Sequence, residues 1–170
     1  QKAVLFSGTV QDNIFFGQSE AADTDETLQQ ALQLSQAAEF VDRYPEKAAH
    51  PIAQLGRNVS GGQKQRLSIA RALARRPEIL IFDDSFSALD YKTDATLREG
   101  LAKQLPGTTK IIVAQRISTI RHADQILVLD RGEIAGLGTH DALMASCPVY
   151  REIAMSQLSE EELKKGGASK

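Results

Sequence analysis

The stretch Asn58-Val59-Ser60-Gly61-Gly62-Gln63-Lys64-Gln65-Arg66 decides how the rest of the chain is interpreted. Its serine and two adjacent glycines stand directly before a helical pattern of apolar residues: Leu67, Ile69, Ala70, Leu73 and Ala74. Glycine lets a ligand approach the backbone closely, and the first N–H groups of a helix have no partner within it. These donors lie at the positive end of the helix dipole, so the stretch predicts a phosphate site.

The same residues have a purely structural interpretation. Ser60 followed three residues later by Gln63 is the pattern of a capping box, in which each side chain satisfies a backbone N–H group of the other residue. A capping box needs no ligand, so the residues alone leave both interpretations open.

A family resemblance favours the phosphate site. Val59–Arg66, followed by Ile-Ala-Arg-Ala-Leu at 69–73, resembles the signature motif of the ATP-binding-cassette (ABC) ATPases, and the resemblance covers Gln1 to about Leu158. It implies an α/β, P-loop NTPase-like partial domain with a mostly parallel sheet, flanking helices and a small α-helical subdomain. It also implies that this helix start faces the γ-phosphate of an ATP held by a second cassette, with contacts from Ser60 and the amides of Gly61 and Gly62. Gln63 belongs to the same nucleotide-binding motif.

The composition is that of an ordinary globular domain. Apolar residues make up 42% and charged residues 25% of the 170 residues, and the net charge of −2 shows none of the basic excess of nucleic-acid-binding proteins. The single cysteine, Cys147, cannot form an internal disulfide and is expected to be a buried small apolar residue. No apolar run approaches the roughly 18 residues of a membrane span.

The first residues resemble the Q-loop region of ABC exporters. Gln1 is followed by Leu5-Phe6-Ser7-Gly8-Thr9 and Asp12-Asn13-Ile14. The resemblance implies that Gln1 touches the nucleotide site, with its Mg²⁺ and attacking water, and that the segment behind it meets a transmembrane domain. Helices are then expected from Thr9 to about residue 16, after Thr24 and at 39–43, and with the signature helix they form a helical subdomain of about 9–76.

The second part, 77–158, is expected to be the RecA-like core. Ile79-Leu80-Ile81-Phe82 is a short continuous apolar run, which predicts a strand buried on both faces. It ends in Asp83-Asp84, where ligand groups gather in open α/β sheets. This resembles the Walker B motif and implies that Asp83 holds Mg²⁺. The second acid is normally the glutamate that acts as general base, and here it is Asp84.

Asp84 is one methylene shorter than glutamate, so its carboxylate falls short by roughly 1.5 Å. A second departure follows the predicted strand Lys110–Ala114, where the family's switch histidine is replaced by Gln115, which cannot become a cation. The segment Ser85–Asp90, which lies between Asp84 and Gln115 in the sequence, resembles the D-loop of the family. The resemblance implies that Ser87 and Asp90 reach the nucleotide site of the second, facing cassette. The two departures together predict a degenerate catalytic site.

The remaining chain predicts two more strands, 125–129 and 133–137, joined by a turn at Asp130-Arg131-Gly132, then helices at 139–144 and 149–158 and a flexible tail at 159–170. No Gly-x-x-x-x-Gly-Lys-Ser/Thr phosphate loop is found. We therefore expect the later portion of a nucleotide-binding domain that is inactive alone. Its sheet is expected to have an uncovered edge, which favours a poorly stable, swapped or associated form.

The sequence thus predicts an ATPase subunit of an ABC exporter on the cytoplasmic face of the membrane, using ATP and Mg²⁺. Its partners would be a transmembrane domain and, because of Asp84 and Gln115, a different second nucleotide-binding domain in a heterodimer. Three alternatives stay open: a homodimeric exporter in which Asp84 works as base, a DNA-repair or chromosome-structure ATPase, and a silent module that only binds nucleotide.

Overall fold

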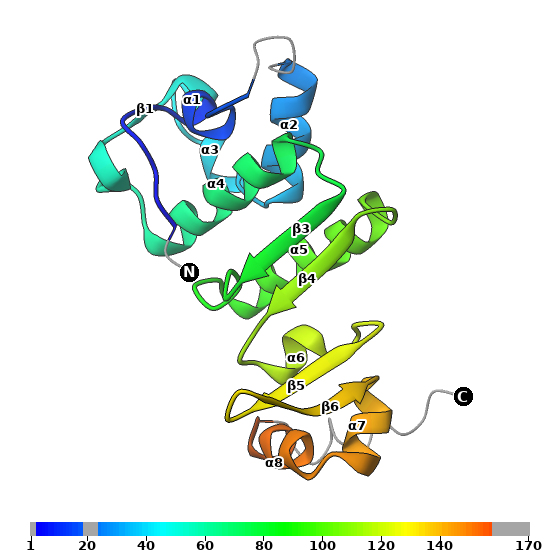
Figure 1. Ribbon diagram of the computed structural model, residues 1–170. Helices are drawn as coiled ribbons and strands as arrows, with labels where there is room; N and C mark the ends of the chain where they lie inside the picture. Colours follow the sequence, from blue (N-terminus) through cyan, green and yellow to red (C-terminus); the bar gives the residue numbers. More distant parts are fainter. Residues whose placement is uncertain (1–2, 19–23, 158–170) are drawn as a thin grey trace. The chain divides into compact units, whose positions relative to one another are not determined.

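The computed structural model describes residues 3–18 and 24–157, which fall into two compact units, Gln1–Val113 and Ala114–Lys170 (Figure 1). Gln1 and the predicted tail 159–170 lie outside the described residues. The division falls after Val113, within the part expected to be the core, and the subdomain boundary at 76–77 stays a prediction. Within residues 3–18 and 24–157, the helices are too short or too polar to span a bilayer.

The first unit begins with helices and ends with a strand pair. Its elements are β1 (Gly8–Thr9), α1 (Val10–Ile14), α2 (Asp25–Leu34), α3 (Ala38–Val41), η2 (Lys47–Ala49), β2 (Pro51–Ile52), η3 (Gln54–Gly56), α4 (Gly61–Ala74), β3 (Ile79–Asp83), α5 (Tyr91–Gln104) and β4 (Thr109–Val113).

The predicted helix starts are confirmed by their caps. Thr9 forms a capping box with Asp12 at the start of α1, and the Thr24 side chain accepts a hydrogen bond from the amide of Thr27 at the start of α2. Each cap satisfies a backbone donor that the helix itself cannot.

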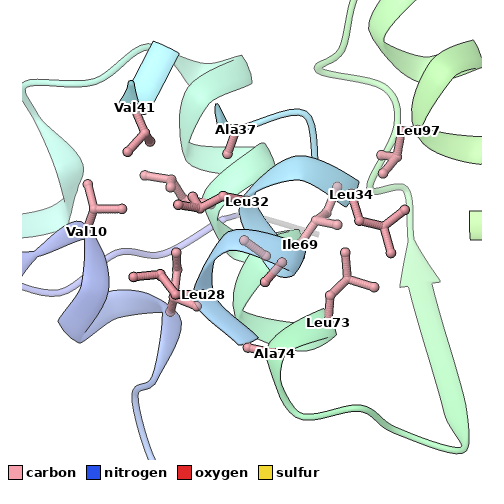
Figure 2. Packing of buried hydrophobic residues seen from close by; sticks show 14 of the residues in the cluster. Val10, Leu28, Leu32, Leu34, Ala37, Val41, Ile69, Leu73, Ala74 and Leu97 are labelled. Atoms are coloured by element: carbon pink, nitrogen blue, oxygen red, sulfur yellow. The ribbon is translucent and has the colours of Figure 1, made fainter. Parts of the chain in front are cut away.

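Helix α4 lies at the centre of the helical part of this unit. Leu67 and Ala70 are fully buried, because α1 and α2 pack against the apolar side of α4. Figure 2 shows this packing, with labelled side chains from the segments around α4 and from α4 itself: Val10, Leu28, Leu32, Leu34, Ala37, Val41, Ile69, Leu73, Ala74 and Leu97. The i, i+3, i+4 pattern of the sequence is therefore the buried face of the helix.

Strands β3 and β4 form a parallel pair, with Ile79 opposite Thr109 and Asp83 opposite Val113. Only one face is buried: Leu80 and Phe82 belong to the same cluster as Leu97 and Leu101 of α5. On the other face Ile79, Ile81, Ile111 and Val113 are between 48% and 68% exposed. The prediction that both faces of Ile79–Phe82 are buried is wrong for this chain, because α5 covers one face and no described segment of the unit covers the other.

The second unit contains α6 (Ile117–Ile120), β5 (Ile126–Asp130), β6 (Glu133–Gly138), α7 (His140–Ser146) and α8 (Pro148–Gln157). Strands β5 and β6 pair antiparallel through a turn at the predicted place, but Asp130 still belongs to β5 and only two residues form the turn. These two residues, Arg131 and Gly132, both have positive φ, 50° and 84°. Such a turn matches the twist of a hairpin. Parallel pairing among the described residues is thus limited to β3 and β4.

Side chains from α7 and α8 bury one face of this hairpin. Leu143, Cys147 and Tyr150 form a cluster with Ile126 and Val128. The expectation that Cys147 is a buried apolar residue is confirmed, since it is 3% exposed and free of a disulfide.

Candidate functional site

The start of α4 has both features that the sequence predicted. Ser60 is the N-cap, its Oγ accepts a hydrogen bond from the Gln63 amide (3.3 Å), and the Gln63 side chain accepts one from the Ser60 amide (2.9 Å). The capping box is therefore present. It occupies Ser60 Oγ as an acceptor and leaves the hydroxyl hydrogen available for donation.

The capping box does not use the two glycines. Within the described part of the chain, the amides of Gly61 and Gly62 donate to no acceptor, as expected for the first residues of a helix. A Cβ on Gly62 would lie 3.3 Å from the carbonyl oxygen of Ala88, so packing against the loop before α5 disfavours a side chain there.

Gly61 differs from Gly62, because a Cβ at this position would meet nothing within 4 Å. No neighbour within the described part of this chain requires glycine at 61. The bare backbone at this exposed position is what a ligand approaching from outside requires.

The acidic pair follows β3. Asp83 is the last residue of the strand, and Asp84 has a φ of 49°, in the left-handed region that aspartate tolerates better than most residues. The Asp84 amide donates to the carbonyl of Val113 (3.0 Å), and its carbonyl accepts from the Ser87 hydroxyl (2.9 Å). Strained residues that are held in this way cluster at functional sites.

The loop between β3 and α5 carries the two predicted D-loop residues. Ser87 and Asp90 are both exposed. Asp90 is also the N-cap of α5: its carboxylate accepts hydrogen bonds from the Thr93 amide (3.0 Å) and hydroxyl (2.7 Å). These two bonds lower the pKa of the Asp90 carboxyl below its ordinary value, and the bond from the Thr93 hydroxyl has the larger effect. Asp90 therefore has a structural role within this chain, and its contact with an opposite site stays a prediction.

Gln115 belongs to the second unit, between β4 and α6, and its side chain is exposed. Its backbone is fixed by Gln157 of α8, whose amide group donates to the Gln115 carbonyl (2.8 Å) and accepts from the Ile117 amide (2.9 Å). Gln157 is not recognisable from the sequence, because a glutamine at the end of an amphipathic helix resembles any solvated residue.

The described residues supply few ligands for a magnesium ion. They contain no group of three or more His, Cys, Asp or Glu side chains that could hold a metal. Mg²⁺ in nucleotide sites takes one or two carboxylates together with phosphate oxygens and water. A half-buried Asp83 at the end of β3 fits that donor set as a single protein ligand, and Gln1, the other predicted ligand, lies outside the described residues.

A polar network around Arg71 was likewise not predicted from the sequence. Arg71 of α4 donates to the carbonyls of Asn13 (2.7 Å) and Val4 (3.0 Å) and to the Asn13 side chain (2.9 Å). The available signal was an arginine directly beside the apolar face of the helix, four residues after Leu67.

Comparisons with known proteins identify the family of the chain. The family model described as ABC transporter matches residues 1–87. An ABC transporter ATP-binding protein of Mycobacterium tuberculosis is 47% identical over 158 residues, 92% of this chain and 27% of the relative. An ATP-dependent lipid A-core flippase of Xanthomonas oryzae pv. oryzae is 38% identical over 162 residues, 95% of this chain and 27% of the relative.

Among solved structures, a bacterial Atm1-family ABC exporter with ATP bound has a TM-score of 0.88 and 36% sequence identity, covering 94% of this chain and 28% of that one. The chain spans about a quarter of the length of the curated relatives it matches. The family model covers half of the chain and includes the capped helix with its bare glycine, and on this ground the chain belongs to the ABC transporter family.

Proposed function

We propose that this chain is part of the nucleotide-binding domain of an ABC exporter and serves ATP-driven transport at the cytoplasmic face of a membrane. The observation that carries the proposal is the start of α4, where residue 61 is glycine although no neighbour among residues 3–18 and 24–157 would clash with a side chain there. The similarity to an exporter structure with ATP bound supports it.

The start of α4 would bind the γ-phosphate of an ATP held by a second, facing domain. The free amides of Gly61 and Gly62 and the Ser60 hydroxyl supply donors, and the helix dipole adds positive potential. Donors fixed in this way stabilise the charge on a transferring phosphoryl group. Gln63 acts indirectly, because its capping bond holds Ser60 in place.

The acidic pair would serve the chain's own nucleotide. Asp83 would hold Mg²⁺, with Gln1 as a second ligand, and the ion when bound neutralises charge on the phosphates. Asp84 would be the base and Gln115 the switch residue, and both are suboptimal for the reasons of length and charge given above. We propose that this site hydrolyses ATP slowly, while Ser60–Gln63 completes a faster site in a non-identical partner domain.

The segment Ala3–Gly17 would face the transmembrane domain of the same transporter. This segment resembles the region that follows the Q-loop in exporters, and it exposes Val4, Phe6 and Phe16 at 41–50% of their surface. Exposed apolar surface of this kind marks contacts with partners.

The phosphate contact is tested by Gly61→Ala in the transporter assembled with this chain. We expect steady-state hydrolysis to fall on the order of 100-fold, because an added methyl displaces the phosphate by about 1 Å or more. Thermal stability of the chain should be unchanged or slightly higher. Gly107→Ala is the matched control, since a Cβ at Gly107 also meets nothing within 4 Å. If Gly61→Ala hydrolyses ATP as fast as Gly107→Ala, the phosphate contact is wrong.

The slow site is tested by the double change Asp84→Glu with Gln115→His. We expect hydrolysis at this site to rise on the order of 100-fold in single-turnover measurements, since the longer acid restores the reach of the base. A rate equal to that of the unmodified chain would show that Asp84 already works as base, as in a homodimeric exporter. Nucleotide binding with no hydrolysis in either form would indicate a silent regulatory module.

A further inference from the structure

Two phenylalanine rings form an exposed stacked pair on the first unit. Phe6 precedes β1 and Phe16 follows α1, and their ring centroids lie 4.2 Å apart with an angle of 20° between the planes. The two residues are 41% and 50% exposed. A stacked pair on the surface needs something other than core packing to hold it in one position.

Arg71 provides that support from α4. Its guanidinium carbon lies 5.2 Å from the centroid of the Phe6 ring and 5.9 Å from that of Phe16, within the range of cation–π attraction. Its three hydrogen bonds end on Val4 and Asn13, which stand two and three residues from the two rings.

Asn13 connects the guanidinium to both ring-bearing segments. It is 1% exposed, and its side-chain oxygen accepts from the Phe6 amide (2.8 Å) as well as from Arg71. Its amide group donates to the carbonyls of Phe6 (2.9 Å) and Thr9 (3.0 Å). Every polar atom of the Asn13 side chain is therefore used to hold the chain around the aromatic pair.

Such a network requires arginine specifically. The guanidinium is planar and donates in several fixed directions at once, whereas the ammonium of lysine is a single strongly hydrated point. Burial, and to a lesser degree the neighbouring Arg75, lowers the pKa of Arg71, yet arginine stays protonated. Arg75 adds one further bond, to the carbonyl of Phe16 (2.8 Å).

We infer that Arg71 is a positioning residue that fixes the Phe6–Phe16 pair to α4, so that the exposed pair follows the helix whose other end is the proposed phosphate site. Arg71 lies ten residues after Gly61, about 15 Å along the helix axis. The inference rests on the proposed function in one respect: the link matters to transport only if α4 meets phosphate and Ala3–Gly17 meets the transmembrane domain.

Arg66 offers a matched control on the same helix. It donates to the carbonyl of Gln36 and to Glu39, both at 2.9 Å, and its guanidinium lies 4.8 Å from the Phe40 ring. It thus joins α4 to α3 and to Gln36 just before α3 by the same kinds of contact, and none of these contacts involves Phe6 or Phe16.

The test compares Arg71→Lys with Arg66→Lys in the full chain by amide hydrogen exchange in NMR. We expect the exchange rate of the Phe6 amide to rise about tenfold in Arg71→Lys. Local opening of this segment then no longer has to break the hydrogen bonds from the guanidinium to Val4 and Asn13. Arg66→Lys should leave the Phe6 amide unchanged. If Phe6 exchange is unchanged in Arg71→Lys, or rises equally in both variants, Arg71 only adds general stability and the inference is wrong.

A second measurement does not depend on how well Arg71→Lys folds. Phe16→Ala removes an exposed ring, and the Nε–H signal of Arg71, which donates to Asn13, should keep its slow exchange with water. Loss of that protection would mean that the rings hold the arginine, which overturns the inference. Neither measurement uses ATP, so a failure here is distinct from a failure of the phosphate contact tested with Gly61→Ala.

Discussion

The helices around α4 bury their apolar side chains more completely than the strand pairs do. The apolar side of α4 is covered by α1 and α2, and Leu67 at its centre has no exposed surface. The β3–β4 pair is covered on one face only, and Ile81 on the other face is 68% exposed. The β5–β6 hairpin shows the same one-sided burial, with Leu127 and Leu129 exposed at 52% and 62%.

Because of this difference, we expect most of the chain's stability to come from the helical cluster around α4. A helix with one apolar side can bury that side against helices that lie close to it in the sequence. An apolar strand pair has two faces, and each face needs its own covering layer. We expect substitutions in the helical cluster to cost the most, and substitutions on the bare strand faces to cost little.

The largest effect is expected for Leu67→Ala. It should lower the free energy of unfolding by about 3 kcal/mol, because it leaves a cavity among tightly packed side chains. Ile81→Ala, on the bare face of β3, should cost less than about 0.5 kcal/mol. Urea denaturation followed by circular dichroism measures both. Equal losses would show that the bare face is covered in solution, and the comparison between helices and strands would fail.

A second pair of variants extends the comparison to charges on α5. The carboxylate of Asp94 is 2% exposed and bonds Arg98 at 2.8 Å, whereas Glu99 and Lys103, also four residues apart, are 63% and 72% exposed. Asp94→Ala should cost roughly 2 kcal/mol, somewhat less than a fully buried pair because Arg98 is partly exposed. Glu99→Ala should leave the urea midpoint unchanged, since exposed pairs contribute little. A larger loss for Glu99→Ala than for Asp94→Ala would contradict burial as the deciding factor.

The sequence predicted the helical part well for a physical reason. Thr9, Thr24 and Ser60 are caps whose chemistry acts within three residues, so local sequence suffices to place the helix starts. The hairpin turn at Arg131-Gly132 is equally local. The burial of β3 was predicted incorrectly. An apolar run such as Ile79–Phe82 indicates that both faces of a strand can be buried, but it does not indicate whether the chain supplies a helix or sheet to cover each face.

The candidate site divides in the same way. Ser60, Gly61 and Gly62 could be read from one short stretch, and so could the acids at the end of β3. The network of Arg71 with Asn13 joins residues 58 positions apart, and the bond from Gln157 to Gln115 spans 42. No local pattern identifies such pairs, since each member alone resembles an ordinary polar residue.

A smaller effect is expected at the start of α4. Ser60→Ala removes the acceptor of the Gln63 amide and should lower the free energy of unfolding by about 1 kcal/mol. Ser60→Thr keeps a hydroxyl and should retain most of that stability. Urea denaturation distinguishes the two. If both variants are as stable as the unmodified chain, the capping box contributes nothing, and the serine is there for its ligand alone.

The smallest effect is expected in the second unit and depends on pH. The Nδ1 atom of His140 lies 2.8 Å from the hydroxyl oxygen of Tyr150, which joins α7 to α8. Desolvation first, and then the charge of Arg121, lower the pKa of His140 below 6.5. Asp141 opposes this shift and His122 adds a still smaller contribution to it. The unfolded chain therefore binds a proton more readily than the folded one.

It follows that the stability contributed by His140 is complete above pH 6.5 and is lost as the pH falls from 6.5 toward the lower pKa of the folded state. Native-state hydrogen exchange of the β5–β6 amides at pH 7.5 and 5.5, corrected for the intrinsic effect of pH, measures this loss. His140→Gln should remove most of the difference, and His50→Gln, in the first unit, should leave it intact. If protection of the hairpin is equal at the two pH values in the unmodified chain, the His140–Tyr150 contact does not depend on a neutral imidazole, and the histidine acts there only by its shape.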